Sequence, residues 1–454
     1  MPVNTTCDEY NLNKNKWSKC RVVVSGEEAV KEAGIAYLPM LKKQSVPDYI
    51  AYKERALFYG AAGRTVTGLL GAIFRKNLSF SDDNTIKEEM KNVTNNRKSI
   101  YDLATLVTKE VIVVNRVGVL LDAPENEGNP YLTVYLAESI INWKYTDTQE
   151  GQILSMVVLK EKVSAPGKDE FVKEEKTQYR VLELVEGEYQ QRLFEKDNNK
   201  EYVETKTIVP SVNASTLDYI PFVFINSNDT SATVYDSPIL PLVNVNLSHY
   251  RSSADLEHGR HFTGLPTAWV AGFDMEKELY IGSQVAWVSE DPQANAGFLE
   301  FTGQGLQSLE NALKEKQEMM AVLGARMLEV PKKSVESGLA LSNRYRGENS
   351  ILGSISNTVG KGLTYIVDRL LEWRGITIKN DFSIKLNSDF INDKLSASEI
   401  KDLMAAWQGG ALSWETLFYN YKRGEVYPDS VDMDEEKDRI AAEVEMDVNS
   451  RIIG

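Results

Sequence analysis

The spacing of hydrophobic positions changes along the chain, and each change predicts a different type of structure. Over residues 47–75 and 84–109 apolar side chains recur every three to four positions, the period of a helix. Residues 1–45 are polar and irregular, so we expect a loose arm there. Between 111 and 225 short β-branched and aromatic runs are separated by Gly, Asn and Pro, which predicts a meander of strands. The predicted strands are 111–114, 117–121, 131–136, 153–160, 179–185, 189–195, 205–208 and 220–225.

The second half of the chain is dominated by long helical patterns. Helices are predicted over 239–262 and 306–328, with a small β insert between them. A polar, basic loop is predicted over 331–347, followed by a third helix over 350–373. The insert strands are expected at 267–272, 284–289 and 298–301, one strand at 382–386, and short helices at 396–407 and 413–422 before an acidic tail.

Two long helices around a β insert predict a protruding stalk with the insert at its tip. A helix of about 23 residues spans about 35 Å, which is longer than most globular domains need. Two helices cannot bury their apolar faces alone, so we expect copies of the chain to cover them in a ring. Trp269 and Trp287 in the insert are either a subunit contact or the insert's own core.

Composition excludes several classes of protein. The 454 residues carry 51 Lys and Arg against 66 Asp and Glu, a net charge of −15, which argues against a protein that grips nucleic acid over a wide surface. No run reaches the roughly 18–20 apolar residues of a membrane span. The polar start of the chain lacks the apolar core of a secretory signal. Cys7 and Cys20 are the only cysteines, so a disulfide framework is excluded.

One cluster of residues has the composition of a catalytic or metal site. The chain has neither a phosphate-binding G-x-x-x-x-G-K-[ST] loop nor a G-x-S-x-G elbow. His249, His258 and His261 lie close in sequence to Asp255 and Glu257. On a helix, His249 and His258 are about 900° apart and face opposite sides, whereas His258 and His261 share a face. We expect no catalytic residue, metal or cofactor; a metal-dependent hydrolase using His258, His261 and one of the two carboxylates is the alternative.

The order of these parts resembles that of tailed-bacteriophage portal proteins, the head-to-tail connectors of the capsid. The closest likeness is to the branch usually known only as a phage family of unknown function. The stretches that carry the resemblance are 52–55 (YKER), 64–66 (RTV), 68–74 (GLLGAIF), 220–225 (IPFVFI), 249–255 (HYRSSAD), 257–258 (EH), 337–341 (SGLAL), 386–387 (LN), 389–390 (DF), Trp407 and 409–410 (GG). They occur in order over about residues 50–440.

The resemblance implies an α+β portal-like fold with an α/β wing, a long-helix stem, a small β clip and a helical crown, assembled as a ring, usually a dodecamer. By position it implies an N-terminal arm (1–45), a wing (46–236), stem helices (237–262 and 304–328) around the clip (263–303), a tunnel loop (329–347), a wing-crossing helix (348–378) and a crown (379–454). The clip, with Trp269 and Trp287, would contact neighbouring subunits or an adaptor.

The resemblance also implies the function. A portal is a channel at one capsid vertex through which DNA is packaged and ejected, and it is not an enzyme. The implied partners are double-stranded DNA, the terminase large subunit, major capsid and scaffold proteins and a neck or tail adaptor, with no membrane. The protein would be found in the virion, and in the host cytoplasm during assembly. Another head or neck structural protein is the remaining alternative.

The tunnel loop is where the resemblance places contact with DNA. Lys332, Lys333, Arg344 and Arg346 lie in it. Twelve chains would carry about 12 × −15, or −180, and such a field repels phosphate, so DNA would pass without being held. A few basic groups at the narrowest point would then touch it transiently. A plain solvated loop is the other interpretation of these residues.

Overall fold

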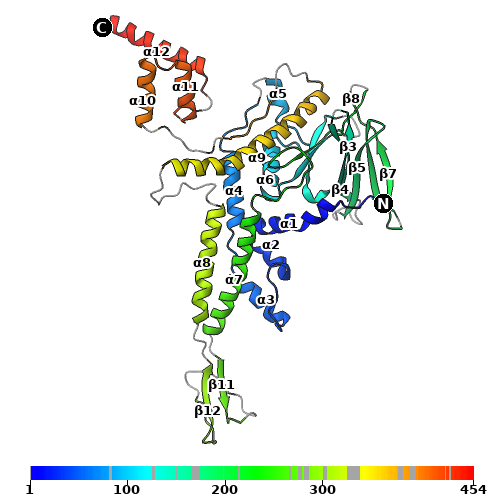
Figure 1. Cartoon of the computed structure of the whole chain (residues 1–454), viewed down its shortest axis with the longest axis vertical. Helices are drawn as coiled ribbons and strands as arrows, with labels where there is room; N and C mark the ends of the chain where they lie inside the picture. Colours follow the sequence, from blue (N-terminus) through cyan, green and yellow to red (C-terminus); the bar gives the residue numbers. More distant parts are fainter. Residues whose placement is uncertain are drawn as a thin grey trace. The chain divides into compact units, whose positions relative to one another are not determined.

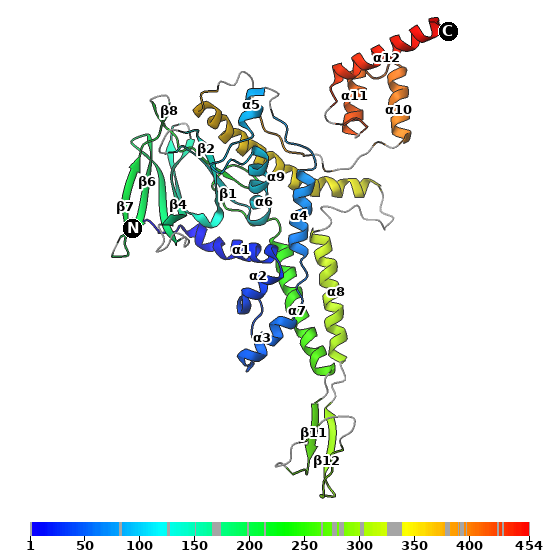
Figure 2. The same cartoon turned by 180° about the vertical axis from the view of Figure 1, so that it is seen from behind.

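The computed structural model describes residues 2–80, 84–124, 128–149, 151–165, 174–197, 199–212, 215–264, 267–274, 279–280, 286–299, 304–324, 338–376, 382–388, 390, 395, 397–424, 426–428 and 431–453. The chain divides into two compact units, Met1–Ser388 and Asp389–Gly454. Figures 1 and 2 show the elements of both units from opposite sides.

The fold class is α+β, as predicted. The first unit begins with α1 (Asp8–Ser25), α2 (Glu27–Glu32), η1 (Gly34–Ala36), α3 (Val46–Arg55), α4 (Ala61–Ile73), α5 (Asn84–Glu89) and α6 (Ile100–Val114). Its sheet region contains β1 (Val117–Asp122), β2 (Tyr131–Leu136), η2 (Ala137–Ser139), β3 (Ile140–Thr148), β4 (Gly151–Ala165), β5 (Glu174–Val185), β6 (Glu188–Lys196), β7 (Tyr202–Ile208), β8 (Ser211–Val212), β9 (Ser215–Thr216) and β10 (Phe222–Ile225). It ends with α7 (Leu240–Gly264), β11 (Thr267–Ala271), β12 (Asn295–Leu299), α8 (Gln304–Gly324) and α9 (Gly338–Trp373).

Two antiparallel sheets form the body of the first unit. One has the order β10-β1-β2, and the other is a meander β3-β4-β5-β6-β7, in which β4 to β7 correspond to predicted strands. Residues 117–121 of β1 are fully buried, because this central strand has a neighbour on each edge. Leu120, Ile140, Val157 and Phe222 join one hydrophobic cluster, so the two sheets share a core.

The N-terminal segment is helical, and the prediction of an irregular arm over residues 1–45 is wrong. Helix α1 buries Trp17, Cys20 and Val23, which follow one another at intervals of three residues on one face. This apolar stripe is only one residue wide, and lysines and asparagines surround it. The helical spacing of apolar residues is therefore too weak to recognise in the sequence, and the helix is stabilised by packing against the rest of the unit.

A cluster of charges fixes α1 to its neighbours. Arg21 donates from Nη1 and Nη2 to both carboxylate oxygens of Glu110 on α6, at 3.1 and 2.6 Å. It also donates from Nε and Nη2 to Glu138 in η2, at 2.5 and 2.8 Å. Burial lowers the pKa of Arg21, but the hydrogen bonds and charges of Glu138 and Glu110 raise it further, so the net shift is upward. The guanidinium therefore ties three separate elements together.

The run at 111–114 forms the end of α6, so the predicted strand there is wrong. Helix α6 starts with a capping box of Ser99 and Asp102 and ends at Asn115, which adopts the left-handed conformation with φ of 59°. These four residues are buried. Burial inside the unit outweighs the strand preference of β-branched side chains. The predicted helices 47–75 and 84–109 are each divided, into α3 and α4 and into α5 and α6.

Other differences concern short strands. Strand β3 was not predicted, because its outer half is exposed and polar. The insert is a two-stranded hairpin, β11–β12, and residues 286–289 are not in a strand, while 281–285 lie outside the described residues. The predicted strand at 382–386 is reduced to one bridge between Lys385 and Ser79.

Helices α7 and α8 lie side by side and run antiparallel in both views (Figures 1 and 2). We call this pair the stem. Their 25 and 21 residues correspond to about 37 and 31 Å. The β11–β12 hairpin connects the end of α7 to the start of α8. The predicted order of elements in this region is confirmed: two long helices enclose a small β insert.

Helix α9 begins at Gly338, so the predicted loop over 331–347 is wrong for its second half. Arg344 and Arg346 belong to this helix of 36 residues, while Lys332 and Lys333 lie outside the described residues. The polar composition of residues 338–347 had masked the continuation of the helical pattern. The second unit consists of α10 (Ala397–Gln408), α11 (Trp414–Arg423) and α12 (Met433–Ile453), close to the two predicted helices and the acidic tail.

Candidate functional site

The stem is held together by close packing and by polar contacts along its length. A Cβ at Gly259 of α7 would lie 2.5 Å from Cδ2 of Leu306 on α8, so the Leu306 side chain packs directly against the backbone of α7 at this glycine. Farther along, Lys316 Nζ donates to the Ser248 carbonyl at 3.3 Å and to Ser252 Oγ at 2.5 Å. The pair therefore behaves as one element.

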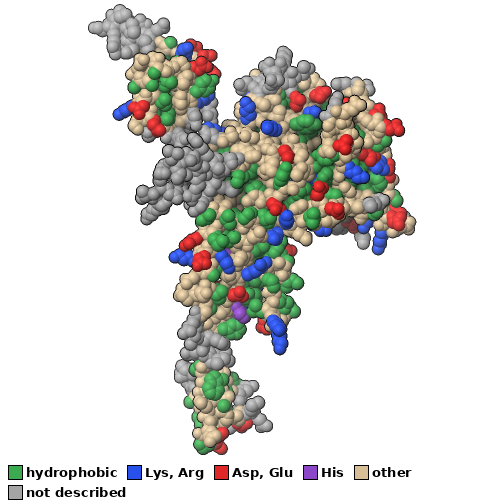
Figure 3. All heavy atoms as spheres, viewed as in Figure 1, with side chains coloured by type: hydrophobic (Ala, Val, Ile, Leu, Met, Phe, Trp, Pro, Cys, Tyr) green, Lys and Arg blue, Asp and Glu red, His purple; other side chains and the backbone are tan. Residues whose placement is uncertain are grey.

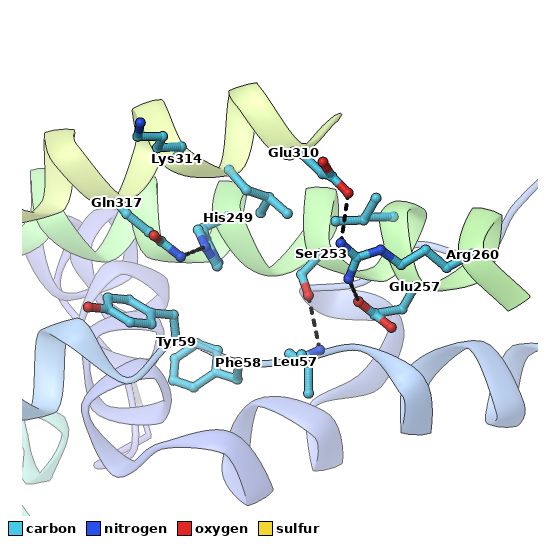
Figure 4. A pocket seen from close by; sticks show the side chains of 12 residues that line it. Leu57, Phe58, Tyr59, His249, Ser253, Glu257, Arg260, Glu310, Lys314 and Gln317 are labelled. Atoms are coloured by element: carbon cyan, nitrogen blue, oxygen red, sulfur yellow. Dashed lines mark hydrogen bonds and ion pairs between the residues drawn. The ribbon is translucent and has the colours of Figure 1, made fainter. Parts of the chain in front are cut away.

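A groove of about 340 Å³ runs along one flank of the stem (Figure 4). Its walls come from α7, α8 and the segment 57–59 that joins α3 to α4. Ser253 Oγ accepts from the Leu57 amide at 3.1 Å, and Asn246 Nδ2 donates to the Tyr59 carbonyl at 2.7 Å. These bonds from α7 fix a short segment that carries three large hydrophobic side chains.

Charged side chains border the groove at the end nearer the hairpin. Arg260 donates at 2.8 Å to Glu257 on its own helix and at 2.8 Å to Glu310 on α8 (Figure 4). All three side chains are partly exposed, so the bridges contribute little stability and mainly orient the groups. Lys314 lies on α8 one turn beyond Glu310.

The three predicted histidines occupy different environments on α7. His249 is buried, its ring lies 5.6 Å from the ring of Tyr59, and its Nε2 is 3.2 Å from Nε2 of Gln317. Burial and then the charge of Lys316 lower the pKa of His249. His258 packs edge-on against Tyr52 at 5.2 Å and Phe262 at 4.7 Å between ring centroids.

The carboxylates near these histidines are engaged elsewhere. Asp255 accepts a hydrogen bond of 2.6 Å from Tyr52 Oη, and burial together with this bond raises the pKa of Tyr52. Glu257 is paired with Arg260. Burial and then the charges of Arg55 and His261 lower the pKa of His258. Within the described part of the chain no group of three or more metal-ligating side chains comes together.

Exposed hydrophobic side chains mark the stem and the hairpin (Figure 3). Met319, Val322 and Leu323 of α8 are 53, 43 and 36% exposed. On the hairpin, Trp269 stands opposite Gly297 and its indole covers that glycine, yet the side chain remains 42% exposed. Surfaces of this type are typical of contacts between proteins.

The second predicted tryptophan lies in the segment between the two hairpin strands. Trp287 Nε1 donates to the carbonyl of Tyr280 at 2.7 Å. Trp287 thus folds onto its own segment, while Trp269 is partly available. Whether either side chain contacts another protein stays a prediction.

The groove was missed by sequence reasoning. One of its walls, the segment 57–59, lies 187 positions from Asn246, the α7 residue that holds Tyr59 in place. The one signal in the sequence is the run Leu57-Phe58-Tyr59, three large hydrophobic residues beside Gly60. A run of this kind at a break between helices indicates either a core contact or an exposed anchor.

Comparisons with known proteins find one family and a set of solved structures. Residues 238–374 match the family described as "Domain of unknown function (DUF4055)", a span that includes the stem, the hairpin and the whole of α9. No curated protein matches the chain.

The structural matches are to chains of gene transfer agent (GTA) particles. A chain of the neck of an empty GTA particle, computed with C6 symmetry, matches with a TM-score of 0.39 and 12% identity over 78% of this chain and 86% of that chain. A chain of the native GTA virion matches with 0.39 and 12% over 84 and 94%. A chain of the native GTA neck with C12 symmetry matches with 0.33 and 12% over 85 and 95%. At these TM-scores the likeness does not establish a function for this chain.

Among the described helices, none is long and apolar enough to cross a membrane.

Proposed function

We propose that the chain is a structural subunit of a phage-type virion, and more specifically the portal subunit that forms a ring-shaped DNA channel at one capsid vertex. The observation that carries this proposal is the stem with its hairpin. Two antiparallel helices leave the body of the first unit and enclose a two-stranded hairpin, which is marginally stable alone. Apolar side chains stay exposed on both, so neighbouring copies are needed to cover them.

The charge of the chain supports a channel rather than a DNA-gripping protein. At −15 per subunit, a ring repels phosphate over most of its surface, and each avoided phosphate contact removes affinity that translocation would have to break. Lys332, Lys333, Arg344 and Arg346 are proposed to supply transient contacts at the constriction. The first two precede α9, and the last two belong to its beginning.

The subunit is proposed to do no catalysis itself. DNA, the terminase large subunit, capsid and scaffold proteins and a neck or tail adaptor are its proposed partners, the adaptor at the hairpin with Trp269. The hydrolase alternative is not favoured by the geometry, because Asp255 and Glu257 already bind Tyr52 and Arg260. Elemental analysis for stoichiometric zinc in the purified protein tests that alternative directly.

The assembly is tested by native mass measurement and electron microscopy of the purified full-length protein. We expect a closed ring of about twelve copies with a central opening. A neck or head protein of another kind would lack the protruding stem in such images. A protein that stays monodisperse and monomeric at micromolar concentration would refute the proposal.

The channel role is tested by replacing Lys332, Lys333, Arg344 and Arg346 together with glutamine. Ring formation and melting temperature should remain close to wild type, since surface substitutions usually change stability by no more than about 0.5 kcal/mol. Packaging or retention of DNA in assembled particles should fall. As a control, glutamine at Lys91 and Lys162, two exposed lysines far along the chain from this region, should leave DNA retention unchanged. Normal retention in the quadruple variant would show that the residues belong to a plain connector.

A further inference from the structure

Tyr52 joins helix α3 to the stem. Its side chain is buried, and its hydroxyl donates to Asp255 Oδ1 on α7 at 2.6 Å. Its ring packs edge-on against the ring of His258, also on α7, with the ring centroids 5.2 Å apart. A change of charge at either partner therefore acts directly on the attachment of α3.

The surroundings of His258 suit a neutral imidazole. The ring lies against both Tyr52 and Phe262, with centroid distances of 5.2 and 4.7 Å. Its Nδ1 atom is buried and has no hydrogen-bond partner among the residues that the structure describes. In the neutral ring with its proton on Nε2, Nδ1 is only an unused acceptor, whereas in the charged ring it becomes a donor. Protonation would therefore leave a buried N–H group without an acceptor, which is unfavourable.

Positive groups face the same ring from both helices. Arg55 is the last residue of α3, and its Nε is buried without a hydrogen-bond partner in the described part of the chain. His261 lies three positions beyond His258 on the same face of α7. The neighbouring Arg260 is balanced, because it pairs with Glu257 and with a glutamate of α8. Burial and then the charges of Arg55 and His261 oppose a proton on His258.

Two carboxylates act in the opposite direction. Asp255 on α7 and Asp48 on α3 favour the charged form of His258, but each already accepts a short hydrogen bond. Asp255 accepts from Tyr52, and Asp48 accepts from Ser45 Oγ at 2.6 Å. The balance of all these groups lowers the pKa of His258.

The chain is tied to α7 on both sides of α3. Arg251 Nε donates to the Tyr37 carbonyl at 2.8 Å, and Ser253 Oγ accepts from the Leu57 amide at 3.1 Å (Figure 4). None of these four groups changes its charge near neutral pH. Residues 38–56, which we call the flap, therefore have fixed ends, and α3 within them can leave α7 without unfolding the stem.

We propose that the flap is released by acid: when His258 takes up a proton beside Arg55, Tyr52 loses its contact with α7 and α3 separates from the stem. This inference goes beyond the proposed function and does not depend on it, because all the groups involved belong to one chain. Release uncovers the face of α7 around His258 and the buried side chain of Tyr52. The device is a histidine switch that works between about pH 7 and 5.

The sign and the size of the effect follow from the two states of the flap. In the released state His258 is in solvent and has an ordinary pKa of about 6.5. In the attached state its pKa is lower, so the released state binds the proton first and attachment is lost as the pH falls below about 6.5. At pH 5.5 a solvated imidazole is protonated about ten to one, so the release equilibrium rises by up to about tenfold.

The test is hydrogen exchange by mass spectrometry on the full-length protein at pH 7.5 and 5.5. Each rate is divided by the intrinsic exchange rate at its own pH, because intrinsic exchange depends strongly on pH. Protection of α3 peptides should fall about threefold to tenfold at pH 5.5 relative to peptides from β4 and β5. Unchanged or greater protection of α3 in acid would overturn the inference, since the surrounding groups would then accept the imidazolium.

Variants assign the effect to His258. His258→Gln and His258→Phe are both uncharged, and phenylalanine keeps a ring against Tyr52. Whichever of them retains wild-type protection of α3 at pH 7.5 should lose the fall at pH 5.5. His261→Gln is the matched control and should keep most of the fall, because His261 is exposed. A fall of wild-type size in the uncharged variants would overturn the inference.

A further variant keeps the inference testable if both substitutions at His258 detach α3 at neutral pH. Arg55→Gln removes the positive charge beside the ring, so the pKa of His258 should move back towards its ordinary value. The fall in protection of α3 between pH 7.5 and 5.5 should then be smaller than in wild type. A fall that is undiminished in Arg55→Gln would overturn the proposed role of this pair.

Discussion

Replacing Arg21 by alanine is expected to detach α1 from the body of the first unit. Glu110 is only 5% exposed, and it loses both of its hydrogen bonds from the guanidinium. Removing one partner of a buried ion pair costs about 3–5 kcal/mol. The side chains of Arg21 and Glu138 retain 26 and 31% exposure, so solvent screens part of the interaction and we expect the lower end, about 3 kcal/mol. At 1.4 kcal/mol per factor of ten, this is roughly 150-fold in the opening equilibrium of the helix.

Hydrogen exchange measured by mass spectrometry on peptides from α1 reports this equilibrium directly. In Arg21→Ala the protected amides of α1 should exchange roughly 100-fold faster, while those of β4 and β5 stay unchanged. Lys16→Ala is the matched control, because Lys16 lies on the same helix as Arg21 and pairs with Asp236, but both side chains of that pair are largely exposed, at 44 and 61%. Its effect should stay within about threefold. Exchange in Arg21→Ala within the same threefold range would refute the reasoning.

Three further perturbations follow from other contacts. Gly324→Val should destabilise the first unit by about 1–3 kcal/mol in thermal unfolding, because a Cβ at this position meets Thr65. Gly305→Val should not destabilise it, because the space around Gly305 is open. Equal effects of the two substitutions would contradict this reasoning. The pKa of His249 is lowered in the folded chain, so as the pH falls the unfolded chain binds this proton first. The stability of the folded state is therefore lost as the pH falls below about 6.5 towards the folded pKa. His249→Gln should flatten the decline in melting temperature between about pH 7.5 and 5.5, and an unchanged decline would exclude His249 as its source. Trp269→Ala should speed proteolysis within the hairpin by uncovering its backbone, and an unchanged cleavage rate would show that the indole does not protect it.

The sequence predicted those elements whose local pattern and tertiary role agree. The strands β1 and β2 are apolar runs bounded by Gly and Pro, and α7 and α8 show their apolar residues at helical spacing. The residues 111–114 were predicted wrongly because the same side chains serve a buried helix as well as a buried strand. Helix α1 was missed because its apolar stripe consists of single residues, and part of its attachment comes from Arg21, a polar side chain.

The candidate site was predictable only in part. The stem could be recognised because both helices and the insert follow one another in the chain. The groove could not, since one wall comes from a segment fixed by Asn246, a residue far away in sequence. The histidines were correctly separated on α7 by their spacing, but the partners of Asp255 and Glu257 depend on tertiary contacts with Tyr52 and on the rotamer of Arg260.

The central position of β1 has a consequence for the synthesis of the chain. Val117 pairs with Ile225, which follows it by 225 − 117 = 108 residues, and the whole five-stranded meander lies between them. At about 5–20 residues per second, one edge of β1 leaves the ribosome about 5–20 s before its partner exists. During this interval a strand that is apolar over residues 117–121 has one unpaired edge, which is the type of surface that joins with other nascent chains. In a protein made in many copies at once, the rate at which β10 emerges thus limits how long each chain stays open to aggregation.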